Sequence, residues 1–575
     1  MTGYPRPLLT TWGEALDPDN PLPEYPRPQL RRDSFVNLNG PWNYAITASA
    51  ALPARWDGTI IVPFSPEAQL SGVHRRLRPG QFLHYQRAFD APEGEQVLLH
   101  FGAVDQWCRV IVNDQLVGEH DGGYLPFSCD VTAALGPTNT LHVIVTDPTD
   151  TGTGSRGKQK IKRGGIWYTP QSGIWQTVWL EAVPRIHVRG VRLEPDLTGL
   201  HITVTTSAPT PVAISVSADD QVIASAQAGS GRRVRVAIPD PQLWSPENPF
   251  LYDLQITADH DVVRSYVGLR TFDTGLDGNG TPRLLLNGQP YFHAGVLDQG
   301  YWPDGLYTAP SDEALIFDIA AMKDLGFTML RKHIKVEPLR WYYHCDRLGM
   351  LVWQDAVNGG GRYNPAVVQV PAVAPVRLRD SHYRAFARHD AQARKAWLEE
   401  LDSMIEVLHN VVSIAVWVPF NEGWGQFDAN DTAVRVRRRD PSRLIDHASG
   451  WHDQGGGDLR SLHVYFRRFR VPWRGDDRVL ALTEYGGYSH HIRANSVSDT
   501  AFGYRRFTSA DKLTEAFRSL HIRQILPAIA KGLSATVYTQ LSDVEDETNG
   551  LLTYDRKEHK LPPDQVRAIV SRLRL

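Results

Sequence analysis

The sequence predicts a multidomain protein built from a jelly-roll β-sandwich, an immunoglobulin-like β-sandwich and a (β/α)8 TIM barrel, in that order. At 575 residues the chain is longer than one ordinary domain. Short strands of alternating polarity fill its first half, and after residues 284–288 the pattern changes to apolar segments separated by helix-length stretches. We expect domain boundaries at 1–183, 184–273 and 274–575.

The first two domains are predicted from strands that alternate apolar and polar residues. Between about residue 30 and residue 183, segments such as QVLLHFGAV and NTLHVIVTD are separated by turns at Asn113-Asp114 and 121–123, which is typical of a jelly roll. Between 185 and 273, six or seven further strands, such as LHITVTTS, fill about ninety residues, as in an immunoglobulin-like sandwich. No Cys…Trp…Cys pattern is present, so an antibody-type domain is not implied.

The third domain is predicted from strands that alternate with helices. Ser311 can cap a helix that Gly326 closes, and a second helix ends at Gly349. The candidate strands are YFHAGV, FTMLRKH, MLVWQD, SIAVWVPFNE, RLIDHAS, SLHVYF, VLALTEY and GLSATVYTQL. Eight such strands predict a (β/α)8 barrel, whose chemistry lies at the C-terminal ends of the strands.

Two glutamates follow apolar runs of this barrel. Glu422 comes after 414–420, at the end of the fourth strand, and Glu484 comes after 479–483, at the end of the seventh. Between the two we expect strands five and six with their helices. A carboxylate at such a place costs desolvation energy, so we expect it to be paired or used. Two carboxyls can divide glycoside hydrolysis between a general acid and a nucleophile, whereas the plain alternative is two unrelated buried acids.

Several motifs carry a family resemblance. They are NGQPYFHAGVLDQGYWPDG, MLRKHIKVEPLRWYYHCDRLGMLVWQD, WVPFNEGWGQF, LTEYGG, TQLSDVEDETNGLLTYDR and TPQSGIWQTVWLE. Together with the domain order they resemble glycoside hydrolase family 2, the group of β-galactosidases, β-glucuronidases and β-mannosidases. The resemblance implies that Glu422 is the acid/base, that Glu484 is the nucleophile, and that Asn421 binds the sugar 2-hydroxyl.

The chain departs from that family's pattern at two places. The family commonly carries a histidine three residues after the arginine of the second barrel strand, whereas here Arg331 is followed by His333, two residues on. The β-glucuronidases carry an Asn-x-Lys pair after the last strand, where this chain has residues 547–549 as Glu-Thr-Asn. The second departure argues against glucuronides.

Four further side chains are candidate substrate-binding residues near the strand ends. Arg331 would lower the pKa of Glu484 and hold it ionised, or it seals the barrel end with a salt bridge. Tyr465 can donate a hydrogen bond to the nucleophile, or it packs in the core. Asp355 binds sugar hydroxyls, or it pairs with Arg331 or a neighbouring lysine. His333 either binds substrate or has a structural role.

Loop residues complete the predicted site. Trp424, Trp451 and Trp473 follow strands four, five and six, where an indole can stack on a sugar ring or merely pin its loop. The acidic run 543–547 matches no EF-hand spacing, so we interpret it as a polar loop rather than a cation site. No CxxC or HExxH motif occurs, and we expect neither a metal nor a cofactor.

Bulk properties exclude other classes of function. The net charge of −3 implies no broad basic face for nucleic acid. No run of 18 apolar residues and no apolar leader occurs, so we expect a soluble, cytoplasmic protein that does not bind membranes. The three cysteines favour free thiols over a Cys108–Cys129 bridge. The sequence leaves open whether the chain forms a homo-oligomer.

These observations predict a retaining exo-glycosidase that removes one sugar from the non-reducing end of a glycoside or oligosaccharide. By resemblance the default substrate is a β-galactoside. Three alternatives stay open: a catalytically inactive carbohydrate-binding or scaffold protein, a furanosidase, and a transglycosidase that uses the same two glutamates. Fold alone does not choose among them.

Overall fold

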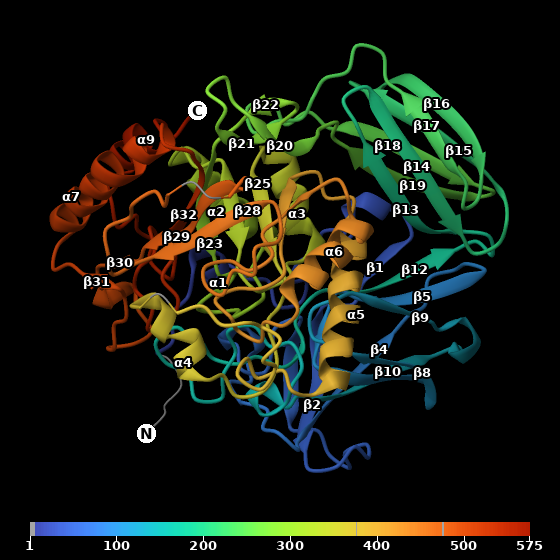
Figure 1. Ribbon diagram of the computed structural model, residues 1–575. Coiled ribbons are helices and arrows are strands. Elements are labelled where there is room, and N and C mark those ends of the chain that lie inside the picture. The colour runs from blue at the N-terminus through green and yellow to red at the C-terminus, as the bar shows by residue number, and fades with distance from the viewer. Residues whose placement is uncertain (1–5, 375, 474–475) are drawn as a thin grey trace.

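The computed structural model describes residues 6–374, 376–473 and 476–575, and it shows the three predicted architectures. In Figure 1 the barrel lies at the centre, the immunoglobulin-like sandwich at the upper right and the jelly roll below. The order of the three along the chain is the predicted one. The exact domain boundaries remain predictions.

The jelly roll consists of two antiparallel sheets. One sheet has the order β1 (Phe35–Asn37), β12 (Val178–Val183), β5 (Gln96–Phe101), β9 (Phe127–Asp130). The other has the order β3 (Gly58–Val62), β2 (Gly40–Thr47), β4 (Phe82–Phe89), β10 (Asn139–Thr146), β7 (Trp107–Val112), β8 (Gln115–Asp121). The alternating apolar positions of these strands, such as Trp42, Tyr85, Leu99 and Val110, are buried in one core.

The second sandwich has seven strands, within the predicted number. Its sheets have the orders β13 (Val188–Pro195), β14 (Gly199–Thr206), β17 (Arg233–Ala237), and β16 (Gln221–Gly229), β15 (Pro211–Ala218), β18 (Tyr252–Ala258), β19 (Asp261–Val267). In β18 the residues Leu254 and Ile256 are buried while their neighbours Asp253 and Gln255 are exposed. This period of two is what predicted the strand.

The barrel is a near-closed sheet of eight parallel strands. Their order is β27 (Leu444–Ile445), β26 (Ile414–Val418), β25 (Leu351–Asp355), β24 (Met329–Lys332), β23 (His293–Asp298), β32 (Leu533–Thr539), β29 (Val479–Gly486), β28 (Leu459–Val464). All eight predicted strands are present, although the fifth is shorter than predicted. Every residue of β25, β26 and β32 is buried, as expected of strands covered on both faces.

The helices around the barrel match the prediction only in part. The larger ones are α2 (Asp312–Asp324), α3 (Leu339–Leu348), α5 (Ala391–Leu408), α6 (Ala429–Arg439), α7 (Ala510–Leu520) and α9 (Pro563–Val570). The Ser311 hydroxyl accepts a hydrogen bond from the backbone N–H of Ala314 and so caps α2, and Gly349 ends α3 with φ of 72°.

The expectation that strands five and six are each followed by a helix is wrong for the described residues. The segments 446–458 and 465–473, with 476–478, contain no helix. The first holds glycines at 450 and 455–457 and the second holds a proline at 472, and neither has an apolar repeat of helical period. Each segment runs as a long loop from the end of one strand to the start of the next parallel strand.

Smaller elements complete the fold. They are α1 (Thr11–Glu14), α4 (Pro365–Val368), α8 (Leu526–Ile529), β6 (Val104–Asp105), β11 (Gly173–Ile174), β20 (Phe272–Leu276), β21 (Pro282–Leu286), β22 (Gln289–Pro290), β30 (Tyr488–Ser489) and β31 (Arg505–Arg506). All three cysteines are buried and free, as predicted. Among the described residues, no helix has the length and apolar composition needed to cross a membrane.

The jelly roll also contributes to the barrel mouth through residues 156–163, which we call the basic segment. Its sequence, RGKQKIKR, places a cation at nearly every second position. Arg156 Nη2 donates to the carbonyl of Gly361 at 3.1 Å, and Arg163 Nη1 contacts Glu545 Oε2 at 3.0 Å. The basic segment is therefore tied to two barrel loops that are far apart in the sequence.

Candidate active site

Glu422 reaches the barrel mouth through a strained turn. It follows the fully buried strand β26, and its φ of 51° lies in the left-handed region that non-glycine residues seldom adopt. A backbone hydrogen bond of 2.9 Å from Glu422 N to the carbonyl of Ser449 holds the turn, and Gly423 continues it with φ of 74°. Such strain is typical of residues that the fold must aim at one place.

Glu484 lies near the end of β29 and is held by two donors. Arg331 Nη1 contacts Glu484 Oε1 at 3.3 Å, and the Tyr465 hydroxyl donates a short hydrogen bond to Oε2. One oxygen of Glu484 and one of Glu422 lie within 4.8 Å of each other and of a His463 ring nitrogen. The two glutamates singled out in the sequence therefore meet at one place, with exposed fractions of 7% for Glu422 and 4% for Glu484.

His463 links the two acids, and sequence reasoning missed it. Its Nδ1 lies 2.8 Å from Glu422 Oε1 and 3.5 Å from Glu484 Oε2. Its Nε2 lies 3.5 Å from Arg331 Nη1 and 3.2 Å from the Ser449 hydroxyl oxygen. His463 therefore bridges Glu422 to Arg331 and Ser449. Its place two residues before Tyr465, on the same face of the strand, was the available signal.

The environments of the two glutamates differ. Burial raises the pKa of Glu422 to about 7, although the charges of Lys158 and Arg331 act in the opposite direction. Burial also raises the pKa of Glu484, but that carboxylate accepts hydrogen bonds from both Arg331 and Tyr465. Because such donors stabilise the ionised form, they favour ionisation of Glu484. Burial lowers the pKa of His463 to about 4, so its ring is neutral near pH 7.

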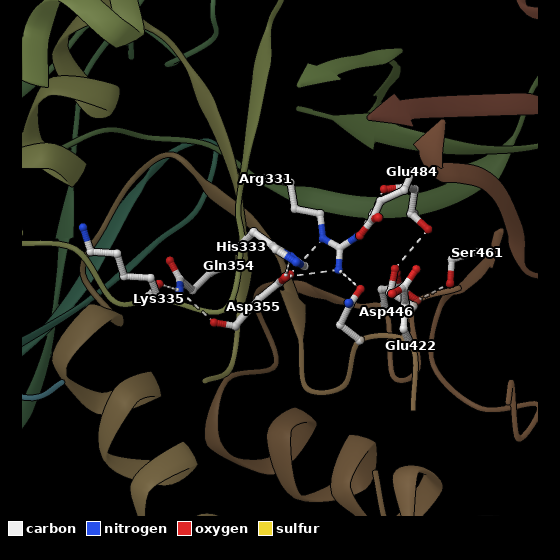
Figure 2. Close-up of polar contacts among 12 residues, drawn as sticks. Arg331, His333, Lys335, Gln354, Asp355, Glu422, Asp446, Ser461 and Glu484 are labelled. Atoms are coloured by element: carbon white, nitrogen blue, oxygen red, sulfur yellow. Dashed lines mark hydrogen bonds and ion pairs between the residues drawn. The ribbon is translucent and has the colours of Figure 1, made fainter. Parts of the chain in front are cut away.

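Arg331 is the centre of a buried network. Figure 2 shows its guanidinium between Asp355 on one side and Glu484 on the other. Its Nε and Nη2 donate to the two oxygens of Asp355 at 2.9 and 3.1 Å, and Nη2 also donates to Asn421 Oδ1 at 2.8 Å. His333 Nδ1 lies 2.8 Å from Asp355 Oδ2. The structure thus pairs Asp355 with Arg331 while keeping both beside the glutamates.

Two buried polar atoms beside the acids have no hydrogen-bond partner among the described residues. One is Asn421 Nδ2, and the other is Trp451 Nε1. The Trp451 ring packs edge-on against His463 with centroids 5.4 Å apart. A buried donor without a partner costs free energy that the hydroxyl of a bound sugar can recover. The sugar-binding roles predicted for both residues remain predictions that these open donors support.

The other two loop tryptophans have different places. Trp424 is buried and packs against the ring of His333 at 6.2 Å, and against Trp167 of the jelly roll at 5.2 Å. Trp473 is 92% exposed, so the structure does not bring it to the acids. Through these two contacts Trp424 links the jelly roll to the candidate active site.

Lys158 is a second residue that sequence reasoning missed. It belongs to the basic segment, is 5% exposed, and holds its Nζ 5.5 Å from the ring centroids of both Trp424 and Tyr168. Its charge lowers the pKa of Glu422 and of His333. It comes from a different domain, about 260 residues before Glu422, so strand-end reasoning within the barrel could not find it. The alternating cations of RGKQKIKR were the available signal.

The acidic run 543–547 is neutralised by protein side chains. Asp543 pairs with Lys560 at 2.6 Å, and Arg163 contacts both Glu545 and Asp546 at 3.0 Å. The fifth position, Glu547, accepts a hydrogen bond from the Tyr168 hydroxyl. These contacts support the interpretation of this run as a polar loop that docks the jelly roll onto the barrel.

The spacing of Glu422, His463 and Glu484 would also suit a metal ion. Both oxygens of Glu484 already accept hydrogen bonds from protein donors, Arg331 and Tyr465. The expectation that no metal binds here remains a prediction.

Three family models match the chain and together cover more than half of it. The galactose-binding domain-like model of glycosyl hydrolase 2 matches residues 80–176, the model of glycosyl hydrolases family 2 matches 186–270, and the TIM barrel domain model of that family matches 283–470. The chain belongs to glycosyl hydrolases family 2. The last match includes Glu422 and His463, and it ends before Glu484.

Curated relatives of the family 2 chain are distant. A beta-galactosidase of Thermoanaerobacter pseudethanolicus is 25% identical over 297 residues, which are 47% of this chain and 39% of that protein. A beta-glucuronidase of Streptococcus agalactiae is 24% identical over 533 residues, 80% of this chain and 84% of that one. A beta-galactosidase of Pseudoalteromonas haloplanktis is 26% identical over 553 residues, which are 86% of this chain and 48% of that protein. The chain thus spans half or less of the length of both galactosidases.

Solved structures share the fold across nearly the whole chain. A beta-D-glucuronidase of Dictyoglomus thermophilum has a TM-score of 0.73 at 17% identity, covering 95% of this chain and 98% of that one. A beta-galacturonidase of Eisenbergiella tayi, bound to galacturonate, has a TM-score of 0.70 at 18% identity, covering 94% and 98%. At such identities the likeness is one of fold.

Proposed function

We propose that this family 2 chain is a retaining exo-glycosidase in which Glu422 is the acid/base and Glu484 the nucleophile. The observation that carries the proposal is the short separation of two buried carboxyls, with oxygens within 4.8 Å of each other. Retaining enzymes hold their carboxyls about 5–5.5 Å apart, whereas inverting enzymes need about 6.5–9.5 Å to admit a water molecule. Oxygens within 4.8 Å of each other favour the retaining arrangement over the inverting one.

The first step of the proposed reaction is attack by Glu484 on the anomeric carbon. Arg331 and Tyr465 orient its carboxylate, and Glu422 gives its proton to the departing oxygen as the glycosidic bond breaks. The pKa of about 7 suits Glu422 to this task, because a carboxyl must still hold its proton at the working pH. His463 Nδ1 lies 2.8 Å from Glu422 Oε1, within hydrogen-bond distance of the carboxylate that the step leaves behind.

In the second step Glu422, now ionised, takes a proton from water, which attacks the glycosyl-enzyme and releases Glu484. Two displacements at the anomeric carbon retain its configuration. The depth of the site supports exo action, since acids that are 4–7% exposed suit a terminal sugar better than the middle of a long chain. The names of two relatives make a β-galactoside the default substrate. The sugar is removed from a simple glycoside or from the end of an oligosaccharide.

A panel of nitrophenyl glycosides tests this proposal. It should include the β-galactoside, β-glucoside, β-mannoside and β-glucuronide, together with an arabinofuranoside. Hydrolysis of at least one, abolished in Glu484→Gln, is the expected result. If the folded protein cleaves none of them but binds sugars, it is a carbohydrate-binding protein and the proposed function is wrong.

A further inference from the structure

A hollow is lined by the tyrosine that contacts the proposed nucleophile. It has a volume of about 330 Å³ and lies among the loop after β28, the end of β29 and the strands β30 and β31. Tyr465, whose hydroxyl is bonded to Glu484, stacks on Tyr504 with ring centroids 3.7 Å apart and an interplanar angle of 5°. Both rings of this stacked pair line the hollow, so Tyr465 contacts the hollow and the candidate active site alike.

Three arginines line this hollow, and no acidic residue of the described chain lines it with them. Arg467 and Arg468 come from the loop after β28, and Arg505 comes from β31. Over the described residues, none of the three forms an ion pair with a carboxylate, and no aspartate or glutamate lines the hollow. The chain as a whole carries a net charge of −3, so this concentration of positive charge is local. Other arginines near the site, such as Arg163, are paired with acids.

Aromatic rings make up much of the remaining lining. Phe466 packs edge-on against Tyr504 at 5.4 Å, and Arg505 lies 5.8 Å above the ring of Tyr488. The loop that carries Arg467 and Arg468 is anchored by a 2.9 Å hydrogen bond from Phe469 N to the side chain of Gln524. Aromatic faces suit the apolar face of a sugar ring or a planar aglycone, and the volume is near the lower end of ordinary ligand sites.

We propose that this hollow, the arginine pocket, binds a sugar-sized anionic ligand through Arg467, Arg468 and Arg505. Its charged group is a carboxylate or a sulfate, oxyanions that present two oxygens to the paired N–H donors of a guanidinium. The ligand comes either from the substrate, as an acidic group on the aglycone or on the next sugar, or from solution as a separate small acid. From either source, the ligand contacts the stacked pair of Tyr465 and Tyr504, of which Tyr465 is bonded to Glu484.

The two sources can be separated by two measurements. The first is binding alone, by isothermal titration of glucose 6-sulfate with glucose as its neutral match, and it does not depend on the proposed function. The double variant Arg467→Gln/Arg505→Gln removes two of the guanidiniums. The control is Arg506→Gln, which removes one positive charge from the neighbouring residue of β31, outside the pocket, and is matched to the single variant Arg505→Gln. We expect the double variant to weaken sulfate binding about tenfold or more, and the control to change it less than about twofold.

The second measurement is kinetic and rests on the proposed function. Nitrophenyl glycosides with and without a carboxylate on the aromatic ring are compared, and glucose 6-sulfate is added to the neutral one. A higher kcat/KM for the charged aglycone, lost in the double variant, assigns the ligand to the substrate. A changed rate on the neutral glycoside when glucose 6-sulfate is added assigns it to a separate acid.

Several results would overturn the inference. Glucose 6-sulfate that binds no more tightly than glucose would show that the arginine pocket takes no anion. Equal losses in Arg505→Gln and in Arg506→Gln would reduce the effect to long-range charge. If sulfate binding behaves as expected while no glycoside is hydrolysed, the proposed function fails and the arginine pocket stands.

Discussion

Replacing Tyr465 with phenylalanine removes one hydroxyl that bonds the proposed nucleophile and leaves the ring in place. The ring is held by its stack on Tyr504 at 3.7 Å, so the fold should not change. A hydrogen bond to a charged group contributes about 1.5–3 kcal/mol. At about 1.4 kcal/mol per tenfold in rate, kcat/KM should fall about 10- to 150-fold. The loss arises because Glu484 is oriented less well and is ionised less readily.

The same variant should change the pH dependence in one direction. The hydroxyl of Tyr465 lowers the pKa of Glu484, so its removal raises that pKa. Because the nucleophile must be ionised, the acidic limb of the kcat/KM profile moves to higher pH. The assay is kcat/KM against pH on the best nitrophenyl glycoside of the panel.

A matched control keeps this test specific. Tyr485→Phe removes a hydroxyl from the residue next to Glu484, but that hydroxyl contacts His521 Nε2 at 2.8 Å. We expect Tyr485→Phe to keep the position of the acidic limb. Wild-type kcat/KM with an unshifted limb in Tyr465→Phe would refute the reasoning that this phenol supports the nucleophile.

Three further predictions follow from the site. The wild-type kcat/KM should decline above about pH 7, because Glu422 must be protonated; a profile flat to pH 9 would contradict its role as the acid. Lys158→Met should move that basic limb to higher pH, since losing a cation raises the pKa of Glu422, whereas Lys160→Met, from the same basic segment, should not. Arg331→Met should lower turnover at least about 100-fold, and it should also lower the Tm because it leaves Asp355 without its buried partner. Unchanged turnover with a lowered Tm would make this arginine structural only.

The barrel and its two glutamates could be predicted from the sequence because both depend on local patterns of residues. An apolar run that ends in Asn421-Glu422 or in Glu484 predicts a strand and places its carboxyl at the barrel mouth. Strand order then brings Arg331 and Tyr465 to the nucleophile, since each ends or follows a strand of the same sheet.

Features that depend on long-range packing could not be predicted in this way. Lys158 reaches the site only because the jelly roll docks on the barrel, through contacts such as Arg163 with the acidic run. The contact of His463 with both acids depends on where its ring is placed in three dimensions. The helices expected after strands five and six, absent from the described residues, are not formed because the local sequences hold glycines at 450 and 455–457 and a proline at 472.

The roles of the two glutamates are tested most directly by azide rescue, with the product configuration assigned by NMR. In Glu422→Ala, a dinitrophenyl glycoside needs no protonation to leave, so the glycosyl-enzyme should form and then accumulate for lack of a base. Azide needs no base, and we expect it to restore turnover and to give a glycosyl azide of retained configuration, while Glu484→Gln stays inactive. Rescue of Glu484→Gln with retention, or rescue of neither variant, would contradict the assignment of Glu422 as acid/base and Glu484 as nucleophile.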